Sequence, residues 1–240
     1  MILVGSGALL WRAVRHAVDV GAVVDVVCTP FGSMPPRGLE SVPHLPVADV
    51  NGHAEVLIGA CTDQVIWSVN NPTILGPELV NSGLRIYNVH NGPLPDYRGL
   101  PQLAVVHAIL DGRTEYAATL HAVDTGIDTG PVLDTEPFAI DAHDRFEDVM
   151  LRGLRACHDL FVRNLEAAVD DRLTPVPGCG GARPGSYFGA RSLPGLAGRA
   201  DHPNFERATA LGVFAPHYPE ISALVRPPRP YRPTDPEEPR

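Results

Sequence analysis

Short apolar runs alternate with helical patterns along the first third of the chain. Residues 2–4 are apolar, residues 23–28 form a second run rich in β-branched side chains, and residues 8–20 between them carry apolar side chains at helical spacing. A strand, a turn, a helix and a second strand in this order are typical of the first unit of a Rossmann-like sheet. The turn, Gly5-Ser6-Gly7, lacks the third glycine of a dinucleotide-binding fingerprint, so it predicts a tight turn.

The same alternation continues to residue 170. We predict buried or half-buried strands at 65–69, 84–90 and 117–123, an extended run at 131–140 that pairs back, and helices at 73–82, 101–112 and 144–170. Asp144 is expected to cap the last helix. Residues 56–59 fit a helix or a strand equally well. The pattern therefore predicts an α/β, Rossmann-like fold with a central, mostly parallel sheet.

The composition changes after Pro175, where glycine, proline and arginine dominate. We predict a main domain over residues 1–170 and a small C-terminal extension over 171–225, of which only 203–225 looks ordered. The last residues, 226–240, are rich in proline and are predicted to be a disordered tail.

Charge and composition narrow the function classes. All 19 basic residues are arginine, so the chain has neither a P-loop lysine nor a lysine that could form a Schiff base. Residues 1–170 carry 21 acidic residues and 10 arginines, and the net charge of the whole chain is -9. Because phosphate contacts need clustered basic side chains, we do not expect nucleic acid as a partner.

Membrane and metal partners are not expected either. No stretch approaches the ~20 apolar residues of a membrane span, and no basic segment precedes the N-terminal apolar run as in a secretory signal. The four cysteines, Cys28, Cys61, Cys157 and Cys179, show no C-x-x-C spacing. The absence of such spacing favours reduced thiols in a cytoplasmic protein over a structural zinc site.

Three groups of polar residues follow or end the predicted strands. Asn88 and His90 are two residues apart, so their side chains share one face of a strand, and the same holds for Thr119 and His121. The third group is the loop 124–130, with the sequence Asp-Thr-Gly-Ile-Asp-Thr-Gly. Ligands of α/β sheets bind at the carboxyl ends of strands, where Asn88 and His90 are expected to lie.

An amide, an imidazole and a carboxylate together suit acyl transfer. The amide N–H can stabilise an oxyanion, the imidazole can move a proton, and the carboxylate can orient the imidazole and favour its charged form. No serine or cysteine stands in these segments as an obvious nucleophile, which suggests direct attack by the acceptor. Three other interpretations remain: a structural Asn-x-His, a metal site of His90, His121 and Asp128, and a calcium-type turn at 124–130.

Residues 86–133 resemble the core of the formyltransferases that use 10-formyltetrahydrofolate. The shared features are Asn-x-His at residues 88–90, the Leu-Pro and Tyr-Arg-Gly of residues 94–99, and the D-x-G-x-D-x-G loop at 124–130. The similarity extends more weakly over the whole of residues 1–170. Tyr187-Phe188 and the basic Arg191 are faintly similar to a stretch that follows the catalytic domain in several members.

This resemblance implies a set of site residues. Asn88, His90 and Asp128 match the catalytic triad of the family, and Thr119 and His121 match a pair near the active site. The loop whose backbone lines the pterin pocket corresponds to Val123, Asp124, Thr125, Gly126 and Ile127, with no individual side-chain role. The implied co-substrate is 10-formyltetrahydrofolate, with no metal, and residues 1–170 would be the catalytic domain.

The sequence indicates the formyl acceptor less closely than the formyl donor. The segment Gly92-Pro93-Leu94-Pro95 is more like formylation domains attached to peptide synthetases and some amino-sugar formyltransferases, which favours natural product biosynthesis. The candidate acceptors are an amino sugar, an amino acid or hydroxylated ornithine, and an aminoacyl group on a carrier protein; a homodimer is left open. Competing functions are 10-formyltetrahydrofolate hydrolysis, methionyl-tRNA formylation and a non-catalytic folate-binding module.

Overall fold

The computed structural model of the protein describes residues 1–183 and 186–224. A seven-stranded sheet has the order β3-β2-β1-β4-β5-β7-β8, in which the first five strands are parallel and β7 and β8 are antiparallel. Its strands are β1 (Ile2–Gly5), β2 (Val26–Thr29), β3 (His44–Pro46), β4 (Val65–Val69), β5 (Arg85–His90), β7 (Glu115–Ala122) and β8 (Val132–Ala139). The predicted α/β, mostly parallel sheet is confirmed.

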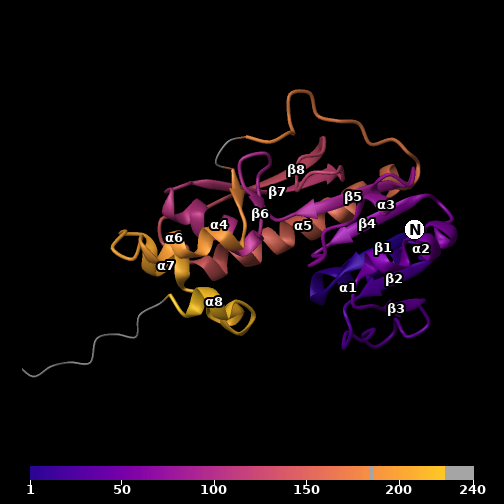
Figure 1. Ribbon diagram of the computed structural model, residues 1–240, viewed down its shortest axis with the longest axis horizontal. Coiled ribbons are helices and arrows are strands. Elements are labelled where there is room, and N and C mark those ends of the chain that lie inside the picture. Colours follow the sequence, from indigo (N-terminus) through magenta and orange to yellow (C-terminus); the bar gives the residue numbers. More distant parts are fainter. Residues whose placement is uncertain (184–185, 225–240) are drawn as a thin grey trace, which may run out of the picture.

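Helices cover the sheet and continue into the C-terminal part of the chain (Figure 1). The α-helices are α1 (Gly7–Asp19), α2 (Ala54–Ala60), α3 (Pro77–Val80), α4 (Pro101–Leu110), α5 (Phe146–Val169), α6 (Leu193–Ala197), α7 (Phe205–Thr209) and α8 (Pro219–Ser222). Short 3₁₀ turns are η1 (Val50–His53), η2 (Ala190–Ser192) and η3 (Gly212–His217). Within the described residues, no helix is both long and apolar enough to cross a membrane.

The two faces of the sheet bury different side chains because strand residues alternate between faces. Leu3, Trp67 and Tyr87 pack with α1 and α5 on one face. Their neighbours Ile66 and Ile86 pack on the other face, in a cluster that includes residues of α2 and α3. Asn88 and His90 continue the second series along β5, so they lie on the face opposite α5.

A second core joins the C-terminal extension to the rest of the fold. The two-residue strands β6 (Arg98–Gly99) and β9 (Tyr187–Phe188) pair in parallel. The apolar cluster around α4 and the start of α5 also takes in side chains of the extension, namely Leu196, Phe205, Ala208, Leu211 and Ile221. In Figure 1 the orange segment after α5 runs over the top of the sheet and back towards β9.

The ordered part of the extension is therefore longer than predicted. Regular structure begins at Tyr187 and not at residue 203, because β9 is held by its pairing with β6. A two-residue strand has no periodicity from which it could be recognised in the sequence. The division at residue 170 stays a prediction, and the predicted disordered tail, 226–240, lies outside the described residues.

The start of the long helix α5 and its N-cap differ from the prediction because of local hydrogen bonds. Helix α5 begins at Phe146, and its N-cap is Arg145, whose N–H donates to the Asp148 carboxylate at 2.9 Å. Asp144, the expected cap, instead accepts a hydrogen bond from Asp141 N–H and pairs with Arg152. The ambiguous residues 56–59 lie in helix α2.

Candidate active site

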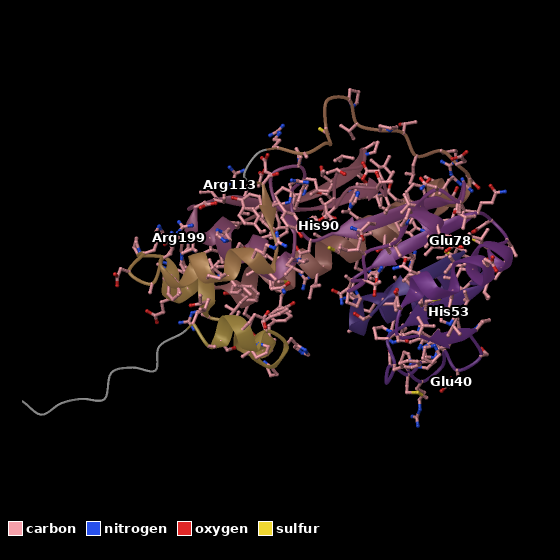
Figure 2. The ribbon with its side chains drawn as sticks, viewed as in Figure 1. Glu40, His53, Glu78, His90, Arg113 and Arg199 are labelled. Carbon is pink, nitrogen blue, oxygen red and sulfur yellow. The ribbon has the colours of Figure 1, made fainter. Side chains whose placement is uncertain are left out.

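Strands β5 and β7 bring four polar side chains to one place. In the antiparallel register, Asn88 lies opposite His121 and His90 lies opposite Thr119. Figure 2 shows His90 near the middle of the molecule. The structure thus joins two of the three groups identified in the sequence.

The third group, the 124–130 loop, is folded by its own side chains. The Asp124 carboxylate accepts hydrogen bonds from Gly126 N–H at 3.0 Å and from the Thr129 hydroxyl at 2.7 Å. A side chain at Gly130 would collide with the Ala122 carbonyl oxygen, since a Cβ there would lie 1.9 Å from it. Asp128 has a positive φ of 52°, which aspartate tolerates better than most residues.

This loop places the Asp128 carboxylate between two imidazoles. Its Oδ2 lies 3.7 Å from His90 Nδ1, and its Oδ1 lies 3.6 Å from His121 Nε2. Gly99 N–H donates to Oδ2 at 2.8 Å. Asn88 Nδ2 lies 3.0 Å from His121 Nε2, which closes a cluster of four side chains.

The outer partners of the two rings fix which nitrogens can exchange protons. His90 Nε2 lies 2.7 Å from the Tyr97 carbonyl oxygen, and His121 Nδ1 lies 2.9 Å from the Ala122 carbonyl oxygen. A carbonyl oxygen only accepts, so both of these nitrogens carry a proton. His90 Nδ1 and His121 Nε2 are therefore the nitrogens that face the cluster.

The carboxyl group of Asp128 is strongly held in its charged form. Burial alone would raise its pKa, because its side chain is only 13% exposed. The charge of His90, the His121 ring and the Gly99 N–H outweigh burial, and the pKa of Asp128 lies well below its usual range. Asp128 is thus a fixed negative charge at the pH of ordinary enzyme reactions.

Thr119 has a structural position beside the cluster. Its hydroxyl donates to the Gly92 carbonyl oxygen at 2.7 Å and accepts from Leu94 N–H at 3.1 Å. These two bonds fix the loop that follows His90. Tyr97, whose carbonyl oxygen holds His90 Nε2, ends the same loop.

The loop after His90 also depends on a glycine in α5. Asn91 is buried, and a Cβ at Gly153 would lie 2.1 Å from its Oδ1. We expect Gly153→Ala to lower the free energy of unfolding by about 1–3 kcal/mol, the usual cost of overpacking. Urea unfolding followed by circular dichroism measures this change. The matched control is Gly59→Ala in α2, where nothing lies within 4 Å and where alanine should stabilise the helix by up to about 1 kcal/mol. Equal effects of the two substitutions would contradict the proposed packing.

Stability should depend on pH through Asp128. The folded-state pKa of Asp128 lies below its unfolded-state value of about 3.9. The stabilisation by the Asp128 charge is therefore fully present above the unfolded-state pKa, and it is lost as the pH falls through the folded-state pKa. The wild type should have a higher free energy of unfolding than Asp128→Asn, and this difference should be largest above about pH 5. The difference should shrink below about pH 4. Urea titrations at several pH values test this, and a difference that grows on acidification would contradict it.

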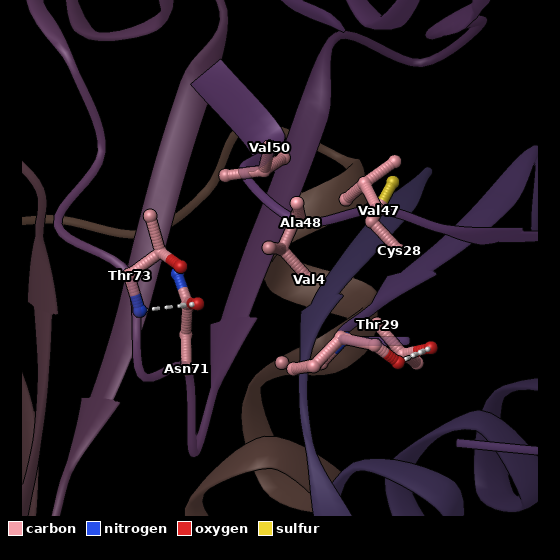
Figure 3. A pocket seen from close by; sticks show the side chains of 10 residues that line it. Val4, Cys28, Thr29, Val47, Ala48, Val50, Asn71 and Thr73 are labelled. Atoms are coloured by element: carbon pink, nitrogen blue, oxygen red, sulfur yellow. Dashed lines mark hydrogen bonds between the residues drawn. The ribbon is translucent and has the colours of Figure 1, made fainter. Parts of the chain in front are cut away.

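A small separate cavity lies over the carboxyl ends of β1, β2 and β4. Its volume is about 20 Å³, which is enough for roughly one water molecule. Figure 3 shows its lining, including Asn71, whose side-chain oxygen accepts from Thr73 N–H at 3.0 Å. The residues of the polar cluster do not line this cavity.

The metal interpretation of the cluster finds no support in its geometry. Among the described residues, the group of three metal-type side chains with ligand atoms within 4.8 Å of one another is Asp25, Cys61 and Asp63. His90, His121 and Asp128 do not form such a group. Their arrangement is that of a carboxylate that contacts each of two imidazoles separately.

Sequence reasoning did not identify the groups that hold the cluster in place. These are the Tyr97 carbonyl, the Gly99 N–H and the Arg98 side chain, which donates to the Ile127 carbonyl oxygen at 3.2 Å. All three belong to the Tyr-Arg-Gly segment that carried part of the resemblance. That segment was the available signal, although two of the three contacts use main-chain atoms that any residue possesses.

The segment that carries the cluster is similar to known proteins. Residues 58–165, which contain Asn88, His90, His121 and Asp128, match the model of the family described as "Formyl transferase". The predicted resemblance to formyltransferases is confirmed. The matched segment runs from α2 into α5 and includes both strands of the cluster and the Asp128 loop.

Two curated relatives share part of this segment. The chain is 35% identical over 105 residues to a methionyl-tRNA formyltransferase of Synechocystis sp., covering 43% of this chain and 31% of the relative. It is 35% identical over 80 residues to a phosphoribosylglycinamide formyltransferase of Bacillus subtilis, covering 33% of this chain and 40% of the relative. The match thus spans about a third of the length of these relatives.

Solved structures of formyltransferases share the fold over most of the chain. A 4-N formyltransferase from Francisella tularensis has a TM-score of 0.72 at 18% identity, covering 87% of this chain and 86% of that one. A sugar N-formyltransferase from Shewanella sp. has a TM-score of 0.66 at 20% identity, covering 82% and 78%. An N-formyltransferase from Helicobacter canadensis, solved with folinic acid and dTDP-3-aminofucose, has a TM-score of 0.58 at 18% identity, covering 79% and 70%.

Proposed function

We propose that this chain transfers the formyl group of 10-formyltetrahydrofolate to the amine of a small molecule. The observation that supports this most directly is the cluster in which Asp128 lies between His90 and His121, with Asn88 beside them. The match to the formyl transferase family over the same residues supports the donor. So does the folinic acid bound in the Helicobacter canadensis neighbour.

The residues present fit such a co-substrate, which would supply an activated formyl carbon to an attacking amine. The loop that would hold the pterin by its main chain is Val123, Asp124, Thr125, Gly126 and Ile127. The Asp124 carboxylate is already bonded to Gly126 and Thr129, so it contributes by keeping the loop in shape. This agrees with a main-chain role for the loop.

Asn88 and His90 would stabilise negative charge on the formyl oxygen. The Asn88 amide nitrogen has two hydrogens, and one of them faces His121 Nε2. The other can be donated to the formyl oxygen. His90 would donate from Nδ1, because its Nε2 proton is held by the Tyr97 carbonyl. Two such donors are worth most in a site from which water is excluded.

Asp128 would act mainly through its charge. A carboxylate with so low a pKa is a weak proton acceptor, but it lowers the energy of a positive charge on His90. The amine must lose a proton as its nitrogen bonds to the formyl carbon, and the departing nitrogen of tetrahydrofolate must gain one. A water molecule held by the Asp128 charge would carry that proton from the amine to the departing nitrogen, while His90 stays a donor.

The acceptor is proposed to be a nucleotide-linked amino sugar, an amino acid, hydroxylated ornithine or a carrier-bound aminoacyl group. Amino sugars come first because two of the neighbours are a sugar N-formyltransferase and an enzyme solved with an amino sugar nucleotide. Formyl transfer to methionyl-tRNA is disfavoured by the net charge of -9, which opposes binding of a polyanion.

The test is release of tetrahydrofolate from 10-formyltetrahydrofolate by the full chain. The reaction is run with no amine, with each class of acceptor and with methionyl-tRNA, and the formylated product is identified by mass spectrometry. Release that requires one class of small amine, with the matching product, supports the proposal. Release without an amine would instead identify a hydrolase, and release only with methionyl-tRNA would overturn the small-molecule acceptor. Folate binding without release under any condition would favour a non-catalytic module.

A further inference from the structure

Arg98 connects the C-terminal extension to the Asp128 loop. Its Nε donates to the Ser186 hydroxyl at 3.1 Å, and its Nη1 donates to the Ile127 carbonyl oxygen at 3.2 Å. The guanidinium also lies over the Tyr187 ring, 5.8 Å from its centroid. One half-buried side chain thus contacts strand β9, the residue before it, and the residue before Asp128.

The next residue repeats this connection with main-chain atoms. Gly99 N–H donates to Asp128 Oδ2, while the N–H groups of Arg98 and Leu100 donate to Ser186 and Phe188 carbonyl oxygens at 2.8 and 2.9 Å. Gly99 has a φ of +99°, and a Cβ there would lie 2.8 Å from the Phe188 carbonyl oxygen. Only glycine permits this close approach of β6 to β9 and of its N–H to Asp128.

The extension makes two further main-chain contacts, one to the Asp128 loop and one to the start of β8. Gly181 N–H donates to the Thr129 carbonyl oxygen at 3.0 Å, and Val176 N–H donates to the Val132 carbonyl oxygen at 2.8 Å. The Asp128 loop therefore contacts the extension at Gly181 as well as Arg98 and Gly99 of β6. Among these contacts, Arg98 supplies a side chain that touches both the extension and the loop.

The acceptors around Arg98 are neutral. Among the described residues it forms no ion pair, and the acceptors of its guanidinium are a hydroxyl and a carbonyl oxygen. A planar guanidinium with several donors in fixed directions can satisfy two such acceptors at once, which the single ammonium group of lysine does less well. This geometry suits a residue that fixes the distance between two segments.

We propose that Arg98 is a positioning residue, which ties β9 to the Ile127 carbonyl and thereby keeps the Asp128 carboxylate between His90 and His121. The inference rests on the proposed function only for its effect on turnover. Its structural part concerns where Asp128 lies and holds whatever the reaction is. A displaced catalytic group can cost about a hundredfold in rate for a shift of about 1 Å, so the effect on formyl transfer should be measurable.

The test compares Arg98→Gln and Arg98→Lys with the wild type. Arg98→Gln should lower kcat of formyl transfer by about tenfold to a hundredfold, while KM for 10-formyltetrahydrofolate changes by less than about threefold. Arg98→Lys should recover part of the loss, because one donor remains. The matched control is Arg172→Gln, which removes the same charge from an arginine whose partners, Glu166 and Asp170, are exposed.

A second readout does not need activity. Imidazole ¹H–¹⁵N spectra, assigned with His90→Gln and His121→Gln, should show shifted signals of both rings in Arg98→Gln and unshifted signals in Arg172→Gln. Ser186→Ala, which removes the acceptor of Nε together with the hydroxyl bond to the Arg183 carbonyl oxygen, should shift them in the same direction. Wild-type kcat together with unshifted imidazole signals in Arg98→Gln would overturn the inference. Shifted signals in a protein without formyl transfer would overturn the proposed function and leave the positioning role supported.

Discussion

Replacing Asp128 with asparagine should lower kcat of formyl transfer by about a hundredfold to a thousandfold, the usual range for the loss of one preorganised electrostatic contact. The substitution keeps the size of the side chain and an oxygen that can accept from Gly99 N–H. It removes the negative charge that faces His90 Nδ1 at 3.7 Å and His121 Nε2 at 3.6 Å. Because the pKa of Asp128 is held well below its usual range, this charge is present throughout the neutral pH region.

Steady-state kinetics with the amine identified in the acceptor panel measure this effect. Glu115→Gln is the matched control, since it removes one negative charge from the exposed start of β7, at the other end of the strand from His121. The control should keep wild-type kcat and KM. Turnover within a factor of about three of wild type in Asp128→Asn would exclude Asp128 from the reaction, since the loss of a working group costs far more.

The centre of the sheet could be predicted because β1 and β4 are buried on both faces. Val65–Val69 is entirely buried, and an uninterrupted apolar run of this kind has few structural alternatives. The alternation along Arg85–His90 placed Asn88 and His90 on one face, and the structure confirms that placement. Helix α1 was equally clear, because its buried side chains recur at helical spacing: Leu9, Leu10, Ala13, Val14 and Ala17.

The site was less predictable because main-chain groups hold it. That Asn88 lies opposite His121 follows from the register of two antiparallel strands, which the sequence does not specify. The positive φ of Asp128 turns its carboxylate towards both imidazoles, and nothing in the spacing of the loop indicates this. The resemblance to formyltransferases supplied the grouping that spacing alone left open.

The extension was the hardest part to predict because its order depends on distant residues. Tyr187 and Phe188 become a strand only by pairing with Arg98 and Gly99, and Phe188 stacks on Tyr97 and His107 at centroid distances of 5.4 and 4.5 Å. Gly- and Pro-rich segments carry no periodic signal for such contacts. The composition of the extension therefore gave no sign that Tyr187 and Phe188 pack against the segment that holds the candidate active site.

Asn88 is coupled to the other side chains of the cluster through His121. Its amide nitrogen contacts His121 Nε2 at 3.0 Å, and Asp128 contacts both imidazoles, so the contacts link all four side chains in one series from Asn88 through His121 and Asp128 to His90. Groups coupled in this way lose activity together, and single substitutions then cost almost as much as multiple ones. The kinetics of Asn88 variants can therefore show whether the cluster is one catalytic unit.

Substituting Asn88 with alanine should lower kcat by about a hundredfold to a thousandfold with little change in KM, because the donor acts on charge that develops only as the amine attacks. Asn88→Asp should be at least as damaging, since it replaces the donor beside His121 with an acceptor and adds a second negative charge to the cluster. Asn81→Ala at the exposed end of α3 should leave both constants unchanged. The Asn88→Ala, His90→Ala double variant should cost about as much as the worse single variant. Near-normal turnover in Asn88→Ala would exclude the amide as the oxyanion donor, and additive losses in the double variant would show that Asn88 and His90 act independently.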